Sequence, residues 1–321
     1  MQDRSIRRVA VVGTGTIGMS WAAFFLSRGI EVTASDPVPG AEARLRQFID
    51  AAWPVLARLG PTAGAPPHQM LTFCADPESA VAAADFVQES APERDGVKQA
   101  LLARIDAVLA PDIVIASSSS GLLISNLVAS CRHPERCVIG HPFNPPHLIP
   151  LVEVVGGAQT APATIERAMA FYAAIGKRPI HIRREIKGHV ANRLQAALWR
   201  EAVHLVAAGV ASVADVDAAI SEGPGLRWAL MGPHLTFHLA GGAGGMAHFL
   251  NELGPPVESW WDDLGSPRLT PEVRDALAQG VAAEAGGRDI AALAAKRDQF
   301  LVDLLALKAS PTLRSRAGGD D

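Results

Sequence analysis

Residues 8–18 read Arg-Val-Ala-Val-Val-Gly-Thr-Gly-Thr-Ile-Gly, a short apolar run followed by three glycines in the spacing GxGxxG. The apolar run predicts a buried β-strand over Arg8–Val12, and the apolar residues after the last glycine predict a helix. A glycine-rich turn between a strand and a helix is the start of a dinucleotide-binding βαβ unit. This stretch therefore predicts the fold of the first half of the chain.

Each glycine of the turn has its own physical task. Gly13 permits the tight turn, Gly15 lets a pyrophosphate approach the backbone, and Gly18 allows close packing of helix on strand. Thr16 and Ile17 lie at the helix N-terminus, whose free N–H groups attract phosphates. A glycine turn without any ligand is the alternative reading when the motif stands alone.

A carboxylate at the end of the next predicted strand favours the cofactor reading. Asp36 follows the strand Glu31–Ser35 and lies 18 residues beyond Gly18. A carboxylate there accepts hydrogen bonds from a ribose 2′-hydroxyl and repels a 2′-phosphate. No arginine adjoins Asp36, since Pro37-Val38-Pro39 follows. We therefore expect NAD rather than NADP.

The first half of the chain alternates apolar, β-branched runs with longer helical stretches, which predicts a doubly wound α/β domain. Several runs are continuously apolar, as in a mostly parallel sheet that is covered on both faces. We expect a Rossmann-type NAD-binding domain over residues 1–186. Its predicted strands are Arg8–Val12, Glu31–Ser35, Met70–Phe73, Phe86–Gln88, Ile113–Ala116, Cys137–Gly140, Leu151–Val155 and Pro179–Arg183. We also expect a helical hairpin from Gly40 to His68 that turns at Gly60–Pro67.

The second half is rich in Ala and Leu at helical spacing, so residues 187–321 are predicted to form an all-helical C-terminal domain. We expect its helices to be interrupted at Gly223-Pro224-Gly225, at Gly241–Gly245 and at Gly254-Pro255-Pro256. Their long apolar faces favour a homodimer formed through this domain, which would also bind a small-molecule substrate.

Bulk properties exclude several classes. The net charge is −4 without a basic block, so no nucleic-acid partner is expected. No apolar stretch reaches the ~20 residues of a membrane span. Three cysteines are too few for a disulfide framework, which favours a reducing cytoplasmic setting. His234 and His238 have a spacing that suits a metal, but the further ligands of a zinc site are missing, so no metal is expected.

A histidine and a glutamate supply the candidate chemistry. His141 begins the run His-Pro-Phe-Asn-Pro-Pro after a predicted strand, at the edge where open α/β sheets bind ligands. Glu153 lies inside Leu-Val-Glu-Val-Val, where a carboxylate is costly unless it is paired. His141 is the simplest partner, because Glu153 would orient the ring and stabilise its protonated form. Taken singly, a core histidine and a solvent-facing glutamate are the plainer alternatives.

Over nearly its whole length the chain resembles the 3-hydroxyacyl-CoA dehydrogenase family. The glycine turn, Ala116–Ser120, His141–Pro145, Leu151–Val154 and Asn192-Arg193 recur in the order and spacing typical of the family. The resemblance implies that His141 is the general base and Glu153 its partner, and that Ser120 and Asn192 contact the reacting oxygen. It also implies that three residues line the ribose and nicotinamide side of the cofactor: Glu93, Lys98 and Asn144.

Within the family, the second half is most similar to the members that oxidise L-carnitine, and next to the L-gulonate dehydrogenases of the lambda-crystallin group. The similarity rests on residues 223–229 and 236–242. A trimethylammonium group binds aromatic faces, so Trp228 and Phe237 are candidates for its pocket. They belong to a hypothetical box with Trp199, Phe249, Trp260 and Trp261, which could instead fill a core or a dimer interface.

The carboxylate of such a substrate calls for a guanidinium. Arg227 is the candidate, followed by Arg193 and Arg200, although each could instead tie two helices together. Three readings remain open: oxidation of L-carnitine, oxidation of a sugar acid or a short 3-hydroxyacyl-CoA, and an NAD-binding structural protein that has lost the reaction.

Overall fold

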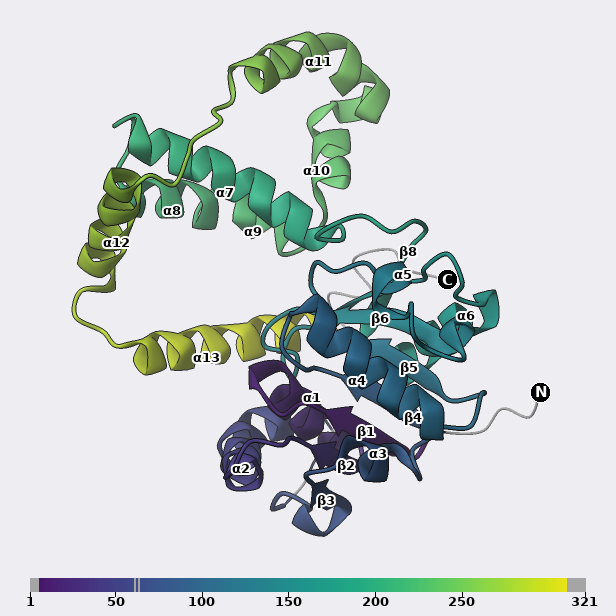
Figure 1. The fold of residues 1–321 in the computed structure, drawn as a ribbon. Helices are drawn as coiled ribbons and strands as arrows, with labels where there is room; N and C mark the ends of the chain where they lie inside the picture. Colours follow the sequence, from purple (N-terminus) through teal and green to yellow (C-terminus); the bar gives the residue numbers. More distant parts are fainter. Residues whose placement is uncertain (1–5, 61, 63, 311–321) are drawn as a thin grey trace. The chain divides into compact units, whose positions relative to one another are not determined.

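The computed structural model describes residues 6–60, 62 and 64–310, which form two compact units. The first unit runs to Asn192 and also takes in Asp298–Ala306. The second unit comprises Arg193–Arg297 and the residues from Leu307 onward. Figure 1 traces both units along the chain, and each is described by itself.

The first unit is built on one eight-stranded sheet with the order β3-β2-β1-β4-β5-β6-β7-β8. All neighbouring strands are parallel except β6 and β7, which form an antiparallel pair. The order reverses between β1 and β4, which is the switch point where such sheets bind ligands. The strands are β1 (Arg8–Val12), β2 (Glu31–Ser35), β3 (Leu71–Cys74), β4 (Phe86–Glu89), β5 (Val114–Ser117), β6 (Cys137–Pro142), β7 (Leu151–Val155) and β8 (Arg178–Ile182).

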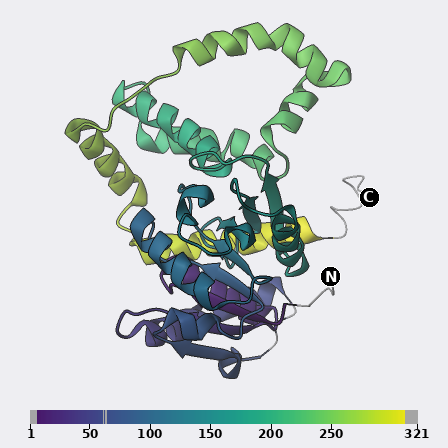
Figure 2. The same cartoon turned by 45° about the vertical axis from the view of Figure 1, so that its right-hand side comes forward.

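Two apolar cores cover the two faces of this sheet. One core packs residues of α1, α2 and α6 on the strands, and the other packs residues of α3, α4 and α5. The views in Figures 1 and 2 both show α4 lying over the sheet. The helices are α1 (Thr16–Ser27), α2 (Ala41–Leu59), α3 (Pro77–Val81), α4 (Asp95–Val108), α5 (Ile124–Leu127) and α6 (Pro162–Ala174). The predicted Rossmann-type sheet is confirmed, and the predicted strands differ from the observed ones by at most two residues at an end.

The predicted helical hairpin is wrong. The helix α2 has no antiparallel partner helix among the described residues that lead to β3, where only a single 3-10 turn at His68–Met70 occurs. The connecting residues contain glycines and prolines, both of which have low helix propensity. The prolines also lack the backbone N–H that a helix needs. The connecting residues that the structure describes before the 3-10 turn, residues 60, 62 and 64–67, form a loop rather than a second helix.

The second unit is helical, as predicted. Its helices are α7 (Ala191–Ala207), which begins in the first unit, α8 (Val213–Ser221), α9 (Pro224–Trp228), α10 (Pro233–Ala240), α11 (Gly245–Asp263), α12 (Pro271–Ala285) and α13 (Ile290–Ala309), whose middle belongs to the first unit. The glycines at 223 and 241–244 separate helices as expected.

One predicted interruption of the helical unit is wrong, because α11 continues through Gly254, Pro255 and Pro256. Both prolines are exposed, so their rings face solvent while flanking residues keep the helix. Within the part of the chain that the structure describes, no helix is both long and apolar enough to span a membrane.

Candidate active site

The glycine turn leaves space for a ligand at one of its three glycines. A Cβ on Gly13, whose φ is +93°, would lie 2.7 Å from the backbone of Ser90 and Ala91. A Cβ on Gly18 would collide with the carbonyl oxygen of Gly13. A Cβ on Gly15 would meet no atom of the described residues within 4 Å. The fold therefore needs glycine at positions 13 and 18, whereas Gly15 leaves the approach to the helix N-terminus open.

The N-terminus of α1 is suited to an anion. Gly15 precedes the helix, no side chain caps its first N–H groups, and no acidic residue lies in its first turn. These N–H groups carry the positive end of the helix dipole and attract phosphate. The residues present thus fit the pyrophosphate of a dinucleotide.

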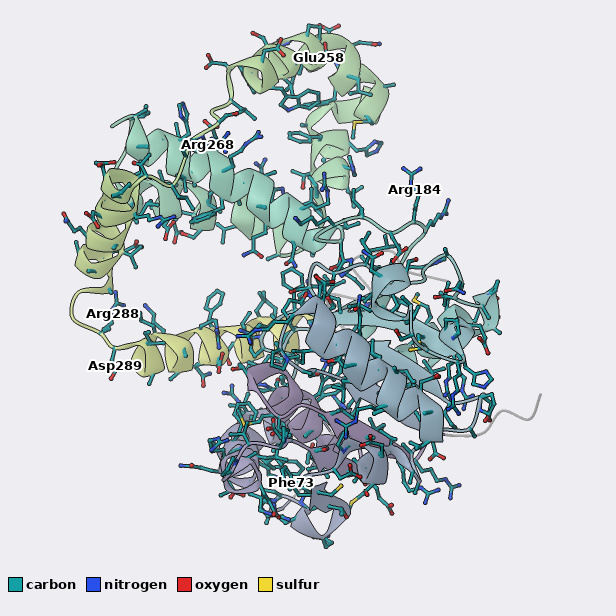
Figure 3. The ribbon with its side chains drawn as sticks, in the orientation of Figure 1. Phe73, Arg184, Glu258, Arg268, Arg288 and Asp289 are labelled. Carbon is teal, nitrogen blue, oxygen red and sulfur yellow. The ribbon has the colours of Figure 1, made fainter. Side chains whose placement is uncertain are left out.

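Asp36 lies between the glycine turn and a cavity of about 570 Å³, which it lines. Its Oδ2 accepts hydrogen bonds from the backbone N (2.8 Å) and Oγ1 (3.0 Å) of Thr14, and its Oδ1 accepts one from the N of Val38. The cavity beside it is lined by residues that include Pro37, Val38 and Phe73. Figure 3 labels Phe73, which projects from β3. Asp36 therefore both fixes the glycine turn and lines a space that fits the adenosine half of the cofactor.

A buried carboxylate lies at the carboxyl end of the central strand β4. Glu89 ends β4 and is fully buried, and both of its oxygens accept hydrogen bonds from Lys98 Nζ, at 2.8 and 3.0 Å. The Oγ of Ser117, its neighbour across the strands, donates to Glu89 at 2.5 Å. Lys98 is only 1% exposed, so it is not a solvated helix lysine. Its Nζ also lies 3.8 Å from Glu93.

Glu93 organises the serine loop that follows β5. Its Oε1 accepts hydrogen bonds from Ser119 Oγ (2.7 Å) and from the backbone N of Ser120 (2.9 Å) and Gly121 (3.0 Å). Burial alone would raise the pKa of Glu93, but these hydrogen bonds and the nearby Lys98 ammonium together lower it. The carboxylate therefore stays ionised and holds Ser120 at the surface of the site.

The structure brings His141 and Glu153 together by strand register. The two residues are direct partners across the antiparallel pair β6–β7, so their side chains leave the same face of the sheet. His141 Nδ1 lies 2.8 Å from Glu153 Oε2, and both side chains are buried. The other oxygen of Glu153 accepts the backbone N–H groups of Val190 and Ala191, each at 2.9 Å.

These contacts decide the charge of Glu153. Burial by itself would raise the pKa of this carboxyl group, but the hydrogen bonds from His141, Ala191 and Val190 outweigh it and lower the pKa. A carboxylate that already accepts two backbone donors keeps one oxygen for the imidazole. It therefore holds the proton on Nδ1 and leaves Nε2 of His141 as the basic nitrogen.

Asn192 and Asn144 lie in different surroundings. Asn192 Nδ2 donates to the carbonyl oxygen of Ser120 at 3.1 Å, so these two residues lie side by side. Asn144 is exposed in the turn after β6, where its peptide bond to Pro145 is cis.

The substrate candidates lie in the second unit. Arg227 and Trp228 lie on α9, and Phe237 lies on α10 and stacks on Phe249 with ring centroids 4.8 Å apart. This stack is the only ring contact that the six aromatic residues of the hypothetical box make among the described residues. Trp228 and Phe237 are 39% and 40% exposed. No cluster of three or more potential metal ligands occurs in the described part of the chain.

Two residues of this site were not predicted. Glu89 is the last residue of β4, and a carboxylate at the carboxyl end of a buried strand is a signal that could have identified it. His189 carries no such signal, because only the fold places its ring beside His141, with centroids 5.2 Å apart.

Comparisons with known proteins identify the family of the chain. The model of the 3-hydroxyacyl-CoA dehydrogenase NAD binding domain matches residues 8–186, and that of the C-terminal domain of the same family matches residues 188–286. An L-carnitine dehydrogenase of Streptomyces coelicolor is 54% identical over 94% of both chains. One of a Pseudomonas species is 49% identical over 98% of this chain and 97% of its own.

A solved structure shares the fold over nearly the whole chain. The crystal structure of 5-formyl-3-hydroxy-2-methylpyridine 4-carboxylic acid 5-dehydrogenase, described as an NAD+ dependent dismutase, superposes with a TM-score of 0.79. The two proteins are 32% identical, and the match covers 98% of this chain and 100% of the other. The chain thus belongs to the 3-hydroxyacyl-CoA dehydrogenase family and is an NAD-dependent dehydrogenase of CH–OH groups.

Proposed function

We propose that this enzyme oxidises the 3-hydroxyl group of L-carnitine to the 3-keto group, with His141 as the general base. The observation that carries the proposal is the buried pair of His141 and Glu153 at the ligand-binding edge of the sheet. The two relatives reported above, each of which matches nearly the whole chain, are named L-carnitine dehydrogenase, which supports this choice of substrate.

In this mechanism NAD supplies the acceptor for the hydride that leaves the carbinol carbon. Nε2 of His141 accepts the proton of the hydroxyl group, because Glu153 keeps the other ring nitrogen protonated. The ionised Glu153 then offsets the positive charge of the imidazolium. Ser120 and Asn192 hold the oxygen as it becomes a carbonyl. Glu93 positions the serine loop and lines the cofactor side, and the buried Lys98 lies beside it.

The ends of the substrate require a cation and aromatic faces. In the proposal Arg227 binds the carboxylate through its planar guanidinium. Trp228 and Phe237 face the trimethylammonium group, where each aromatic face contributes about 1–2 kcal/mol once desolvated. Residues 187–321 then form the domain that supplies the substrate contacts.

A short 3-hydroxyacyl-CoA is a less suitable substrate for this chain. The arginines of α2 that could meet its phosphates already have partners. Arg46 pairs with Glu42 at 2.8 Å, and Arg58 pairs with Asp303 at 2.7 Å. Arg44 donates to the carbonyl oxygen of Pro39. A sugar acid needs several polar partners for its hydroxyl groups, whereas α9 and α10 expose five large apolar side chains (Leu226, Trp228, Leu235, Phe237 and Leu239) beside Arg227, His234 and His238.

One experiment tests the reaction and the substrate together. Purified enzyme is offered L-carnitine, L-gulonate and 3-hydroxybutyryl-CoA side by side, and NADH formation is recorded for each. We expect L-carnitine to give the highest kcat/KM. A higher value for either competitor overturns the substrate assignment. NADH binding without turnover of any of the three would favour a structural protein that has lost the reaction.

We also propose that the protein is a homodimer of the cytoplasm, joined through its helical unit. Many large apolar side chains of this unit are exposed, among them Leu198, Trp199, Leu230, Trp260 and Trp261. A monomer seldom exposes so many, whereas a second copy would cover them. Light scattering should give twice the chain mass. The free thiols of Cys74, Cys131 and Cys137 suit a reducing compartment.

A further inference from the structure

His189 occupies an unusual backbone position next to the candidate base. Its φ is +51°, and it follows Gly188, whose φ is +78°. Left-handed backbone is uncommon for a residue with a Cβ and persists only where the surroundings enforce it. The ring is 1% exposed and lies 5.2 Å from the ring of His141, centroid to centroid.

The His189 side chain holds the serine loop. Its Nε2 lies 3.0 Å from the carbonyl oxygen of Ser119, one residue before the proposed oxygen-binding Ser120. Because a carbonyl oxygen only accepts, Nε2 must carry a hydrogen. Its Nδ1 is buried and meets no hydrogen-bond partner among the described residues. A buried lone pair costs less here than a buried donor without an acceptor, so Nδ1 is the unprotonated nitrogen.

The charge of this ring follows from its surroundings. Burial lowers the pKa of His189, and the neighbouring His141 lowers it further. The hydrogen bond to Ser119 and the carboxylates of Glu153 and Glu93 act in the opposite direction but do not outweigh burial. His189 is therefore uncharged when His141 takes up its proton.

The backbone beyond His189 completes the arrangement. The next two N–H groups, those of Val190 and Ala191, hold Glu153, and the side chain of Asn192 holds the carbonyl oxygen of Ser120. The Gly188–Asn192 segment thus contacts the serine loop through side chains and the carboxylate of the histidine pair through its backbone.

We propose that His189 is a positioning residue for the oxidation, and that its neutral Nε2–H form fixes the serine loop against the pair of His141 and Glu153. This inference rests on the proposed function, in which Ser120 and His141 act on the same hydroxyl group. It assigns His189 no contact with the substrate. A displaced serine loop slows the reaction because Ser120 no longer meets the oxygen at the right distance.

Two amide variants separate the hydrogen bond from the backbone. In His189→Gln the amide nitrogen takes the place of Nε2, so it can still donate to Ser119. In His189→Asn it takes the place of Nδ1 and cannot reach Ser119. Asparagine is the better residue for left-handed backbone. A purely conformational role therefore predicts that Asn is the more active variant, whereas the proposed role predicts that Gln is.

We expect His189→Asn to lower kcat roughly tenfold to a hundredfold, with little change in KM for NAD, and His189→Gln to restore a large part of the loss. Melting temperatures of both variants check their folding. Equal kcat for the Asn variant and the parent, or a higher kcat for Asn than for Gln, overturns the proposal. These assays use whichever of the three substrates the parent oxidises, so a parent that is inactive only on L-carnitine refutes the substrate and not His189.

A second readout needs no substrate. Nuclear magnetic resonance of the parent with ¹⁵N-labelled histidine rings reports the protonation of each ring nitrogen, and the signal lost in His189→Gln identifies His189. We expect a protonated Nε2 and an unprotonated Nδ1 at about pH 7. A doubly protonated ring, or a proton on Nδ1 alone, contradicts the proposal even if every variant is poorly folded.

Discussion

The first unit buries charged groups, and its central pairs are in direct contact: Glu89 with Lys98, and Glu153 with His141. The second unit instead exposes apolar groups. Few of its side chains are buried, and Trp199, Trp260 and Trp261 are each more than half exposed. Burying a charge is costly unless hydrogen bonds compensate it, and the first unit supplies these hydrogen bonds from its own residues. Exposed apolar area is stabilised only when a ligand or another chain covers it.

In the proposed function, residues of the first unit carry out the reaction and residues of the second unit determine its specificity. Changes in the first unit should either slow proton transfer with every substrate or destabilise the fold. Changes in the second unit should alter which substrate is preferred.

The largest effect is expected from His141→Asn. Removing the base should lower kcat by about 10²- to 10⁴-fold, the usual contribution of a positioned general base. The affinity for NADH, measured by fluorescence titration, should stay near that of the parent because the glycine turn is untouched. A variant that turns over as fast as the parent would show that the base lies elsewhere. It would contradict the assignment of the reaction to the first unit.

Lys98→Met should have the next largest effect, on stability. The change leaves Glu89 buried without its cation, which typically costs about 3–5 kcal/mol. For a unit of this size that lowers the melting temperature by about 10 °C. The double variant with Glu89→Gln removes both charges and should recover part of the loss. If the single variant has the melting temperature of the parent, the pair of Glu89 and Lys98 does not stabilise the first unit.

Glu153→Gln tests the orientation of the base. The amide oxygen of the new side chain can still accept from Val190 and Ala191, which turns its NH₂ group toward His141 Nδ1. The imidazole must then carry its proton on Nε2, the nitrogen that should be basic. We expect kcat to fall about a hundredfold to a thousandfold. Adding Glu153→Gln to the His141→Asn variant should lower kcat little further, because the two residues act as one unit.

The same variant gives a pH test. The pKa of Glu153 is lowered from its ordinary value of 4.5, so the carboxylate adds stability above that value and loses it as the pH falls through the folded-state pKa. In urea unfolding, the free energy of unfolding of the parent should exceed that of Glu153→Gln most clearly at neutral pH. This difference in the free energy of unfolding should narrow as the pH is lowered. A gap that is independent of pH would show that the charge of Glu153 does not stabilise the fold.

The same contrast between the units explains what the sequence could predict. The strands were predictable because both faces of each central strand are covered, which leaves continuous apolar runs such as Arg8–Val12. Glu153 was predictable as a partner of His141 because a carboxylate inside an apolar strand needs one. The burial of Lys98 and the ring position of His189 were not, since each depends on where α4 or the Gly188–Asn192 segment lies in the folded unit. The helix α11 also passes through two prolines, so this pair did not mark the end of a helix as expected.

The smallest effect is expected in the second unit, from Trp228→Leu and Phe237→Leu. Loss of one desolvated aromatic face should lower kcat/KM for L-carnitine about tenfold, since such a face contributes about 1–2 kcal/mol to binding a quaternary ammonium. The matched control is the neutral isostere of L-carnitine in which carbon replaces the ammonium nitrogen, because it keeps the shape and loses only the charge. Its kcat/KM should fall less, while light scattering confirms an unchanged oligomeric state. Equal losses for both compounds would mean that these rings only fill space, and the cationic end of the substrate would then have to be recognised by other residues.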